Sequence, residues 1–183
     1  MDKLLAAAEA EFGRRGFSEA RLEDIAAHAG ISRPSLLYHF NSKDALYEAV
    51  VHAAFARLAS AVGAALGGEG SFGARIDALV AGYQAFLDAN PNVARLILRE
   101  VVDGRGPGRA LMVREAIPVL QLVERTAKRE GKGALREGAP VREALLQLGF
   151  TAMIRASVEE LREPLFGKRD HTRELARTLL LKE

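Results

Sequence analysis

The stretch that decides the fold is residues 20–46, which read ARLEDIAAHAGISRPSLLYHFNSKDAL. Two short helical segments meet in it at Gly30, with the small Ala26 before the glycine and Leu36 after it. Ala26 lets the two helices approach closely, Gly30 adopts backbone angles that larger residues resist, and Leu36 fixes the second helix on the first. This spacing predicts a helix-turn-helix unit, whose second helix presents its N-terminal residues to base edges in the DNA major groove.

The second helix of this unit is expected to be very short, from Ser32 to Phe40. Packing alone does not favour so short a helix. It starts with the polar and basic run 32–35, and Leu37-Tyr38-His39 lies between the core anchors. Such a mixture suits sugars, thymine methyl groups and phosphates. The segment therefore predicts a surface that contacts nucleic acid, and the alternative is a helical hairpin that only packs.

Lys43 is a second, independent indication of nucleic-acid binding. It falls in the first turn of the next helix, where the helix dipole disfavours a cation. A phosphate at this position would be held by backbone N–H groups and by the ammonium group together. The run from Ile25 to Lys43 also contains no carboxylate, as a surface for a polyanion requires. The alternative is a solvated lysine beside Asp44.

Two segments of this region, 25–33 and 37–46, resemble the DNA-binding domain of the TetR family of regulators, and Phe12 followed by Gly16-Phe17 fits the same pattern. The resemblance covers roughly residues 3–50, and the remainder agrees only in being helical and of suitable length. It implies operator binding by a homodimer, usually repression, released when a small molecule binds. We accordingly expect a helix-turn-helix domain at 1–48 and a ligand-sensing and dimerisation domain at 49–183.

The resemblance also assigns roles by position. Base-facing positions are occupied by Arg33, Pro34 and Ser35, and backbone-facing positions by Leu37, Tyr38, His39 and Lys43. Position 34 is more often glycine in the family, but proline is tolerated in a first helical turn. Leu37 replaces a frequent tyrosine and loses one hydroxyl contact to phosphate. Arg21 replaces a frequent threonine or serine, so it loses a helix cap but could reach a phosphate by charge.

The apolar spacing is helical almost throughout, and no segment alternates apolar and polar residues as a strand does. We therefore expect an all-α chain, with the three-helix domain followed by roughly six further helices. Gly16 is expected to end the first helix, and Pro118 to kink or break the seventh. The helices are expected at about 4–16, 22–29, 32–40, 42–66, 72–89, 91–102, 110–129, 141–161 and 172–181, with a loop at 104–108.

The second domain offers candidates for a ligand pocket and a dimer interface. Apolar side chains at helical spacing are more often plain core than pocket wall, but a cavity lined by them would favour a largely apolar effector. The pocket candidates are His52, Phe55, Tyr83, Phe86, Arg95, Met112 and Met153. The last two helices suffice for a two-fold four-helix interface. The residues for it are Leu145, Leu148, Phe150, Met153, Ile154, Val158, Leu175 and Leu179.

Other classes of function find little support. The chain of 183 residues has no cysteine, which excludes disulfides and thiolate metal sites. Its histidines lack metal-ligand spacing, and the GxGxxG match at 68–73 follows no strand, so it predicts a loop. We expect no cofactor, no enzymatic activity and, because charges interrupt the apolar stretches, no membrane contact; a cytoplasmic location is the default. The alternatives are a helix-turn-helix dimer without a ligand, such as a nucleoid or division-associated binder, and an all-helical enzyme or adaptor.

Overall fold

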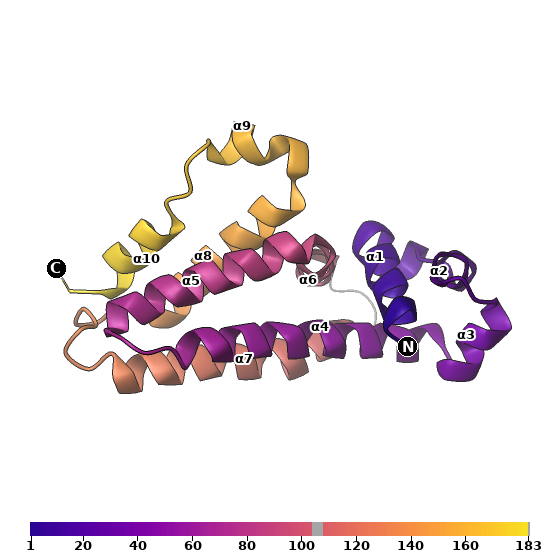
Figure 1. Ribbon diagram of the computed structural model, residues 1–183, viewed down its shortest axis with the longest axis horizontal. Coiled ribbons are helices and arrows are strands. Elements are labelled where there is room, and N and C mark those ends of the chain that lie inside the picture. The colour runs from indigo at the N-terminus through magenta and orange to yellow at the C-terminus, as the bar shows by residue number, and fades with distance from the viewer. Residues whose placement is uncertain (104–107, 183) are drawn as a thin grey trace. The chain divides into compact units, whose positions relative to one another are not determined.

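The computed structural model describes residues 1–103 and 108–182. Those residues form ten α-helices and one short 3-10 helix and contain no β-strand, so the all-α prediction is confirmed (Figure 1). The helices are α1 (Asp2–Glu19), α2 (Leu22–Ala29), α3 (Arg33–His39), α4 (Lys43–Leu66), α5 (Phe72–Ala89), α6 (Pro91–Asp103), α7 (Gly108–Glu130), α8 (Val141–Ser157), the 3-10 helix η1 (Glu159–Leu161), α9 (Arg162–Phe166) and α10 (Thr172–Leu180).

Some helix starts carry the capping chemistry that local sequence predicts. Ser71 precedes α5, and its hydroxyl accepts a hydrogen bond from the Ala74 N–H at 3.2 Å. Such a cap satisfies one of the N–H groups that the first turn leaves unpaired. Pro91 opens α6, where its missing N–H removes no helical hydrogen bond. Of the loop expected at 104–108, residues 104–107 lie outside the described part of the chain, and Gly108 already begins α7.

Three helix ends differ at least in part from expectation. Gly16 interrupts the helix as expected (φ 79°, ψ 170°), but one more helical turn follows it, so α1 ends at Glu19. Pro118 lies inside α7, so the helix does not break there, and the kink stays a prediction. The helix expected to reach residue 161 ends at Ser157; η1 and α9 follow, and α9 holds Pro164 in its first turns, where proline is tolerated.

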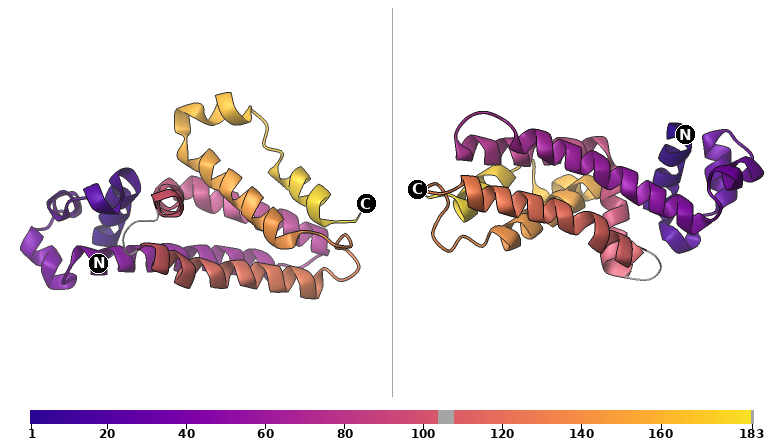
Figure 2. Two further views of the ribbon diagram at one scale, coloured as in Figure 1. Left: turned by 180° about the vertical axis from the view of Figure 1, so that it is seen from behind. Right: turned by 90° about the horizontal axis from the view of Figure 1, so that it is seen from below.

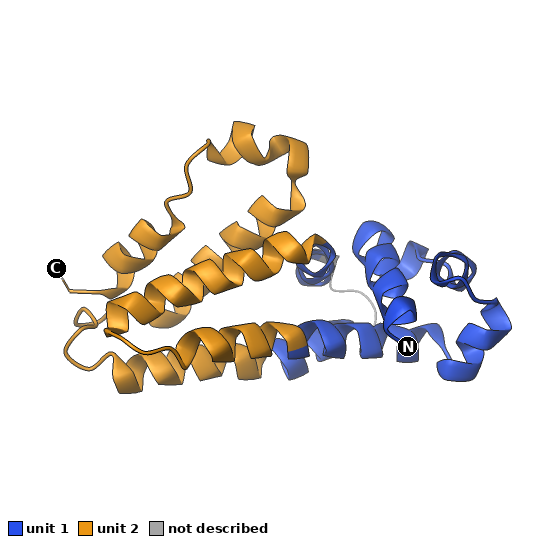
Figure 3. Ribbon diagram, in the orientation of Figure 1, with its two compact units in different colours: residues 1–56, 92–116 blue, residues 57–91, 117–183 orange. Residues whose placement is uncertain are grey.

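The described residues form two compact units (Figure 3). Unit 1 comprises Met1–Ala56 and Asn92–Ala116, and unit 2 comprises Arg57–Pro91 and Ile117–Glu183. Unit 1 therefore holds α1 to α3, the start of α4, and most of α6, which the expected domain boundary at residue 48 assigned to the sensing domain. That boundary, as a division between DNA binding and ligand sensing, stays a prediction.

The core of unit 1 is built around three aromatic rings. Phe12 from α1 and Tyr47 from α4 are fully buried, and their ring centroids lie 4.9 Å apart in an edge-to-face arrangement. Phe17, just beyond the Gly16 break, contacts Tyr47 edge-on at 5.0 Å. Because such pairs stabilise by about 0.5–1.5 kcal/mol beyond area burial, the rings fix α1 and α4 as the support for the helix-turn-helix.

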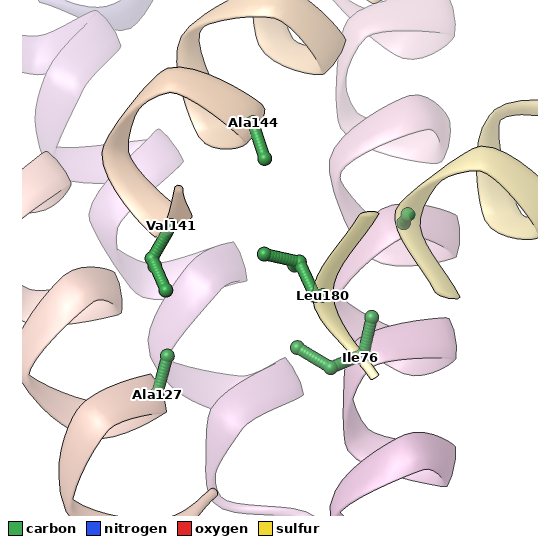
Figure 4. Packing of buried hydrophobic residues seen from close by; sticks show 6 residues of the cluster. Ile76, Ala127, Val141, Ala144 and Leu180 are labelled. Carbon is green, nitrogen blue, oxygen red and sulfur yellow. The ribbon is translucent and has the colours of Figure 1, made fainter. Parts of the chain in front are cut away.

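Unit 2 has its own core where α5, α7, α8 and α10 meet. Figure 4 shows the side chains of Ile76, Ala127, Val141, Ala144 and Leu180 converging on one space, and all five are buried. Figure 2 shows from two further sides that α10 lies along α5 and α8, against which it packs. In unit 2 the last helix, α10, therefore packs against other helices of the same chain.

One expectation about apolar stretches needs correction. By length and composition, α4 could cross a membrane, because its apolar stretch with few charged residues is longer than expected. The same test is passed by the core helix of a folded protein, and α4 buries Leu46, Tyr47, Val50 and Val51 in unit 1. Its apolar composition therefore matches its place in the core.

Candidate nucleic-acid interface

The turn between α2 and α3 is set by Gly30. Its backbone is left-handed (φ 75°, ψ 28°), and its N–H donates to the Ala27 carbonyl at 3.1 Å. The N–H of Ile31 donates to the Ala26 carbonyl at 3.0 Å, which completes a Schellman motif. A side chain at Gly30 would meet no other atom within 4 Å. The glycine is therefore required by its backbone angles and not by lack of space.

The start of α3 is capped by Ser32. Its hydroxyl oxygen accepts a hydrogen bond from the Ser35 N–H at 3.2 Å and lies 3.0 Å from the Ser35 hydroxyl. Pro34 occupies the first turn, where a missing N–H removes no helical hydrogen bond. The predicted base-facing run 33–35 thus forms one rigid helical turn. All three of its residues are exposed.

A single residue anchors α3 to the rest of unit 1. Leu36 is 0% exposed, whereas Tyr38 is 86% exposed and His39 is also exposed. Leu37 is half-buried. The Tyr38 and His39 rings meet edge-on, with centroids 5.7 Å apart. The predicted contact residues thus lie on a short helix (Figure 1) that buries Leu36 fully, leaves Leu37 half-buried and exposes Arg33, Pro34, Ser35, Tyr38 and His39.

Arg33 has a partner that the sequence did not indicate. Its Nε lies 3.1 Å from a carboxylate oxygen of Glu23, in the first turn of α2, and both side chains are more than half exposed. An exposed pair of this kind adds at most about 1 kcal/mol to stability. Its effect is positional, because it holds the guanidinium of a predicted base-reading residue. Pairing across two helices depends on their packing register, which residue spacing alone does not reveal.

Lys43 is tied to α1. Its ammonium group donates to the Ser18 carbonyl at 3.1 Å and lies 4.8 Å from the centroid of the Phe17 ring. Burial lowers the pKa of Lys43, and the charge of Asp44 acts in the opposite direction. An ammonium group has three donors, so one bond to Ser18 leaves capacity for a phosphate. The phosphate role of Lys43 stays a prediction, and the contact with α1 is a second, structural role.

Arg21 lies where the sequence places it, directly before α2. It is exposed, and its side chain makes no capping hydrogen bond, as expected for arginine in place of threonine or serine. Acidic residues in the first turn of α2, Glu23 and Asp24, suit the positive end of the helix dipole instead. A phosphate contact by Arg21 stays a prediction.

Helix α6 supports the helix-turn-helix from within unit 1. Arg99 donates hydrogen bonds to the carbonyl oxygens of Gly13 at 3.1 Å and Arg14 at 2.7 Å. Both carbonyl groups lie in the turn of α1 just before Gly16, where the backbone leaves the helical region. The buried Glu100 accepts a hydrogen bond from the Tyr47 hydroxyl. Burial first, and then the bond to Glu100, raise the pKa of Tyr47. Sequence analysis missed both contacts, since each joins residues more than fifty positions apart.

Glu100 also lies close to Gly108, at the start of α7. The carboxylate occupies the space that a Cβ at Gly108 would need. Its second oxygen, Oε2, is buried and has no hydrogen-bond partner among the described residues. The start of α7 is therefore fitted closely against α6 inside unit 1.

The predicted ligand-binding residues are divided between the two units. Unit 1 contains four of them: His52, Phe55, Arg95 and Met112. Of these, His52 is exposed, with Nδ1 3.3 Å from the carboxylate of Glu115, and Phe55 is buried. Unit 2 contains the other three: Tyr83, Phe86 and Met153. The Tyr83 hydroxyl donates to the Gly149 carbonyl at 3.4 Å, and burial raises its pKa. Binding of a ligand by these seven residues stays a prediction.

Metal chemistry finds no site in the part of the chain that the structure describes. Those residues contain no group of three or more histidine, cysteine, aspartate or glutamate side chains placed to hold an ion. The His171 and Glu174 pair, with Nδ1 and Oε2 2.6 Å apart, is a contact within one turn of α10.

The comparisons with known proteins agree on this region. Residues 4–50 match the profile of the bacterial regulatory proteins of the tetR family. The HTH-type transcriptional regulator RutR of Escherichia coli (strain K12) is 52% identical over 48 residues, which are 26% of this chain and 23% of RutR. The HTH-type transcriptional activator FasR of Mycolicibacterium smegmatis is 37% identical over 95 residues, 52% of this chain and 43% of FasR. The matched segments thus span less than half the length of these relatives.

The similarity of fold extends over the whole chain. The fatty acid degradation regulator FadR from Bacillus halodurans superposes with a TM-score of 0.78, covering 97% of this chain and 96% of that protein. Their sequences are 16% identical, so this comparison concerns the fold alone. The chain thus resembles the tetR family of bacterial regulatory proteins in sequence over residues 4–50, and it shares its fold with FadR over 97% of its length.

Proposed function

We propose that this protein is a transcriptional regulator that binds double-stranded operator DNA through α3. The observation that carries the proposal is the division of α3 into a fully buried Leu36 and an outward set of basic and aromatic side chains. A helix used only for packing would bury more of its seven residues. In this proposal Arg33, Pro34 and Ser35 read bases, and contacts from Tyr38, His39 and Lys43 to phosphates supply affinity.

The proposed active form is a homodimer. A dimer places two recognition helices about one DNA turn apart, roughly 34 Å, in successive major grooves. Aliphatic side chains on the C-terminal helices of unit 2 support an interface there, because they are exposed in the single chain. They are Leu146 and Ile154 on α8, Leu161 at the end of η1, Leu165 on α9 and Leu175 on α10.

The structure refines which residues are available for that interface. Leu145, Leu148 and Leu179, expected among the interface residues, pack against the core of unit 2 within their own chain. Because α10 packs against α5 and α8, its inward residues already belong to the core of unit 2 and are not available to a partner. The proposed interface therefore consists of the outward faces of α8, α9 and α10.

The proposed response is repression that a small molecule releases. A ligand that binds one conformation of the protein better than another shifts the DNA affinity, and DNA must shift the ligand affinity by the same factor. Both α4 and α7 contribute residues to the two units, so they are continuous with both. The name of the M. smegmatis relative describes an activator, so the sign of control needs its own measurement in a reporter assay.

The test of DNA binding is a titration with DNA from the protein's own promoter. Wild type is expected to bind it more tightly than random DNA of equal length. Arg33→Ala should lose about tenfold or more of that preference, because one base contact contributes about 1–3 kcal/mol. Arg129→Ala removes another exposed, ion-paired arginine, in unit 2, and should change nothing. No binding at low salt would contradict the proposal and favour an adaptor.

A further inference from the structure

Unit 2 contains a small cavity at α5, α8, α9 and the turn before α10, and none of the residues predicted to bind a ligand lines it. Its volume is about 70 Å³, far below the roughly 300–1,000 Å³ of pockets for drug-sized molecules. The polar lining consists of Gln84, Asp88, Arg155, Arg162 and Asp170. The apolar lining consists of Leu87, Ala152 and Ala156. The cavity thus combines two guanidinium groups, each paired with an aspartate, and a small apolar wall.

Arg155 is the unusual member of this lining. Its side chain is only 13% exposed, yet its Nε makes no hydrogen bond to any described residue. The contact with Asp170 is an ion pair at 3.4 Å, and the guanidinium carbon lies 5.6 Å from the centroid of the Phe166 ring. A guanidinium group carries five N–H donors. A largely buried group with so few of them used is costly unless an acceptor completes its hydrogen bonds.

Asp170 cannot accept all the remaining hydrogen bonds of Arg155, because both of its carboxylate oxygens already accept hydrogen bonds from other residues. Oδ1 accepts hydrogen bonds from the N–H and the hydroxyl of Thr172 at 2.9 and 2.6 Å. Oδ2 accepts one from the Gln84 amide at 2.8 Å. Burial raises the pKa of Asp170, but these bonds and the nearby arginines outweigh it and hold the pKa below its usual value. Asp170 is thus a fixed carboxylate that positions Arg155, which lines the cavity.

The second arginine of the cavity is more weakly held. Arg162 lies 3.2 Å from Asp88, and both side chains are close to half exposed. An exposed pair of this kind contributes little and is readily exchanged. An incoming acceptor could therefore take Arg162 from Asp88 without disturbing the buried part of the site.

We infer that this cavity binds a small carboxylate with a short apolar tail, held by Arg155. A carboxylate matches the planar guanidinium with two parallel hydrogen bonds, and the wall of Leu87, Ala152 and Ala156 accommodates the carbon atoms beside it. The volume limits the bound part to a few non-hydrogen atoms, so the affinity is expected to be about millimolar. A regulatory role for this carboxylate rests on the proposed function, because the cavity borders the helices proposed to dimerise. The binding of the carboxylate itself does not depend on the proposed function.

The test is saturation-transfer NMR of the full chain with sodium propionate as the probe. Wild type should transfer saturation to the propionate methyl group. Arg155→Gln removes the donors, and Ala156→Leu fills the space while leaving every charge in place. Each should weaken binding by about tenfold or more. Arg173→Gln, an exposed arginine on α10 that does not line the cavity, should bind as wild type does.

Two outcomes overturn the inference. One is no saturation transfer in wild type, which leaves a cavity that holds water only. The other is equal transfer in wild type and Ala156→Leu, which places propionate elsewhere on the surface. Circular dichroism establishes whether each variant is folded. If Arg155→Gln is not folded, Ala156→Leu alone tests whether propionate binds in the cavity. DNA binding measured on the same samples is independent: a chain that binds operator but not propionate loses this inference and keeps the proposed function.

Discussion

Two exposed surfaces of this protein differ in chemistry. On α3 of unit 1, the outward side chains are arginine, serine, tyrosine and histidine around one buried leucine. On α8, η1, α9 and α10 of unit 2, exposed aliphatic side chains alternate with charged ones. Phosphates and base edges require donors and cations, whereas a protein partner requires apolar area that it can exclude from water. The difference is consistent with the two partners proposed above, nucleic acid for the first surface and a second copy of the chain for the other.

The largest expected effect comes from removing the anchor of α3. Leu36→Ala should lower the free energy of unfolding by about 2–5 kcal/mol, because Leu36 is fully buried, and it should abolish DNA binding. Urea unfolding and fluorescence anisotropy measure the two effects. Tyr38→Ala, on the same helix but exposed, should change stability by about 0.5 kcal/mol or less and still weaken DNA binding. Equal destabilisation by both substitutions would make α3 interior scaffold and remove the contrast between the two surfaces.

The next effect concerns the aliphatic surface. Ile154→Glu on α8 and Leu175→Glu on α10 each place a charge where the proposed dimer excludes water, so each should produce monomers in analytical ultracentrifugation. Operator affinity should then fall by about 100-fold or more, because two linked half-sites bind far more tightly than one. Val113→Glu adds the same charge at an exposed valine of α7 and serves as the control. Dimers that persist in both variants would assign the aliphatic residues another partner.

The two surfaces were not equally predictable. The ends of α2 and α3 follow from single residues, because Gly30 takes left-handed angles and Ser32 caps the next turn within a few positions. Local rules of this kind are read directly from sequence. The C-terminal helices gave no such signal at Val158, which leaves helical geometry without a glycine or proline of its own, so η1 and α9 were not predicted. The sequence also could not separate outward Leu146 from inward Leu145.

Contacts between distant residues were unpredictable for a related reason. The pairing of Glu23 with Arg33, and of Tyr47 with Glu100, depends on how two helices are rotated against each other. Periodicity identifies the apolar side of a helix, but it does not match one polar residue with another on a neighbouring helix. These pairs therefore belong to the part of the site that only a structure supplies.

A smaller effect is expected at Lys43, where two roles are now in competition. If the ammonium group also contacts a phosphate, Lys43→Ala should weaken binding to every DNA sequence alike and reduce the slope of log affinity against log salt by about one. If it only holds the Ser18 carbonyl, stability should fall slightly while that slope stays unchanged. Lys43→Arg keeps the charge and should retain the wild-type slope. A change in sequence preference would contradict both roles.

The smallest expected effect tests whether the Glu23–Arg33 pair on the α3 surface affects the preference for operator DNA. Glu23 places a carboxylate 3.1 Å from Arg33, within the roughly 8–10 Å over which charges act at moderate salt. Glu23→Gln should therefore raise affinity for random DNA a few-fold and gain less for operator, because Arg33 is freed to meet any phosphate. Glu19→Gln makes the same charge change at another exposed carboxylate of unit 1. Competition binding at several salt concentrations compares the two variants. If both gain affinity equally and keep the same preference for operator, net charge alone sets binding, and the pair with Arg33 has no part in selecting sequence.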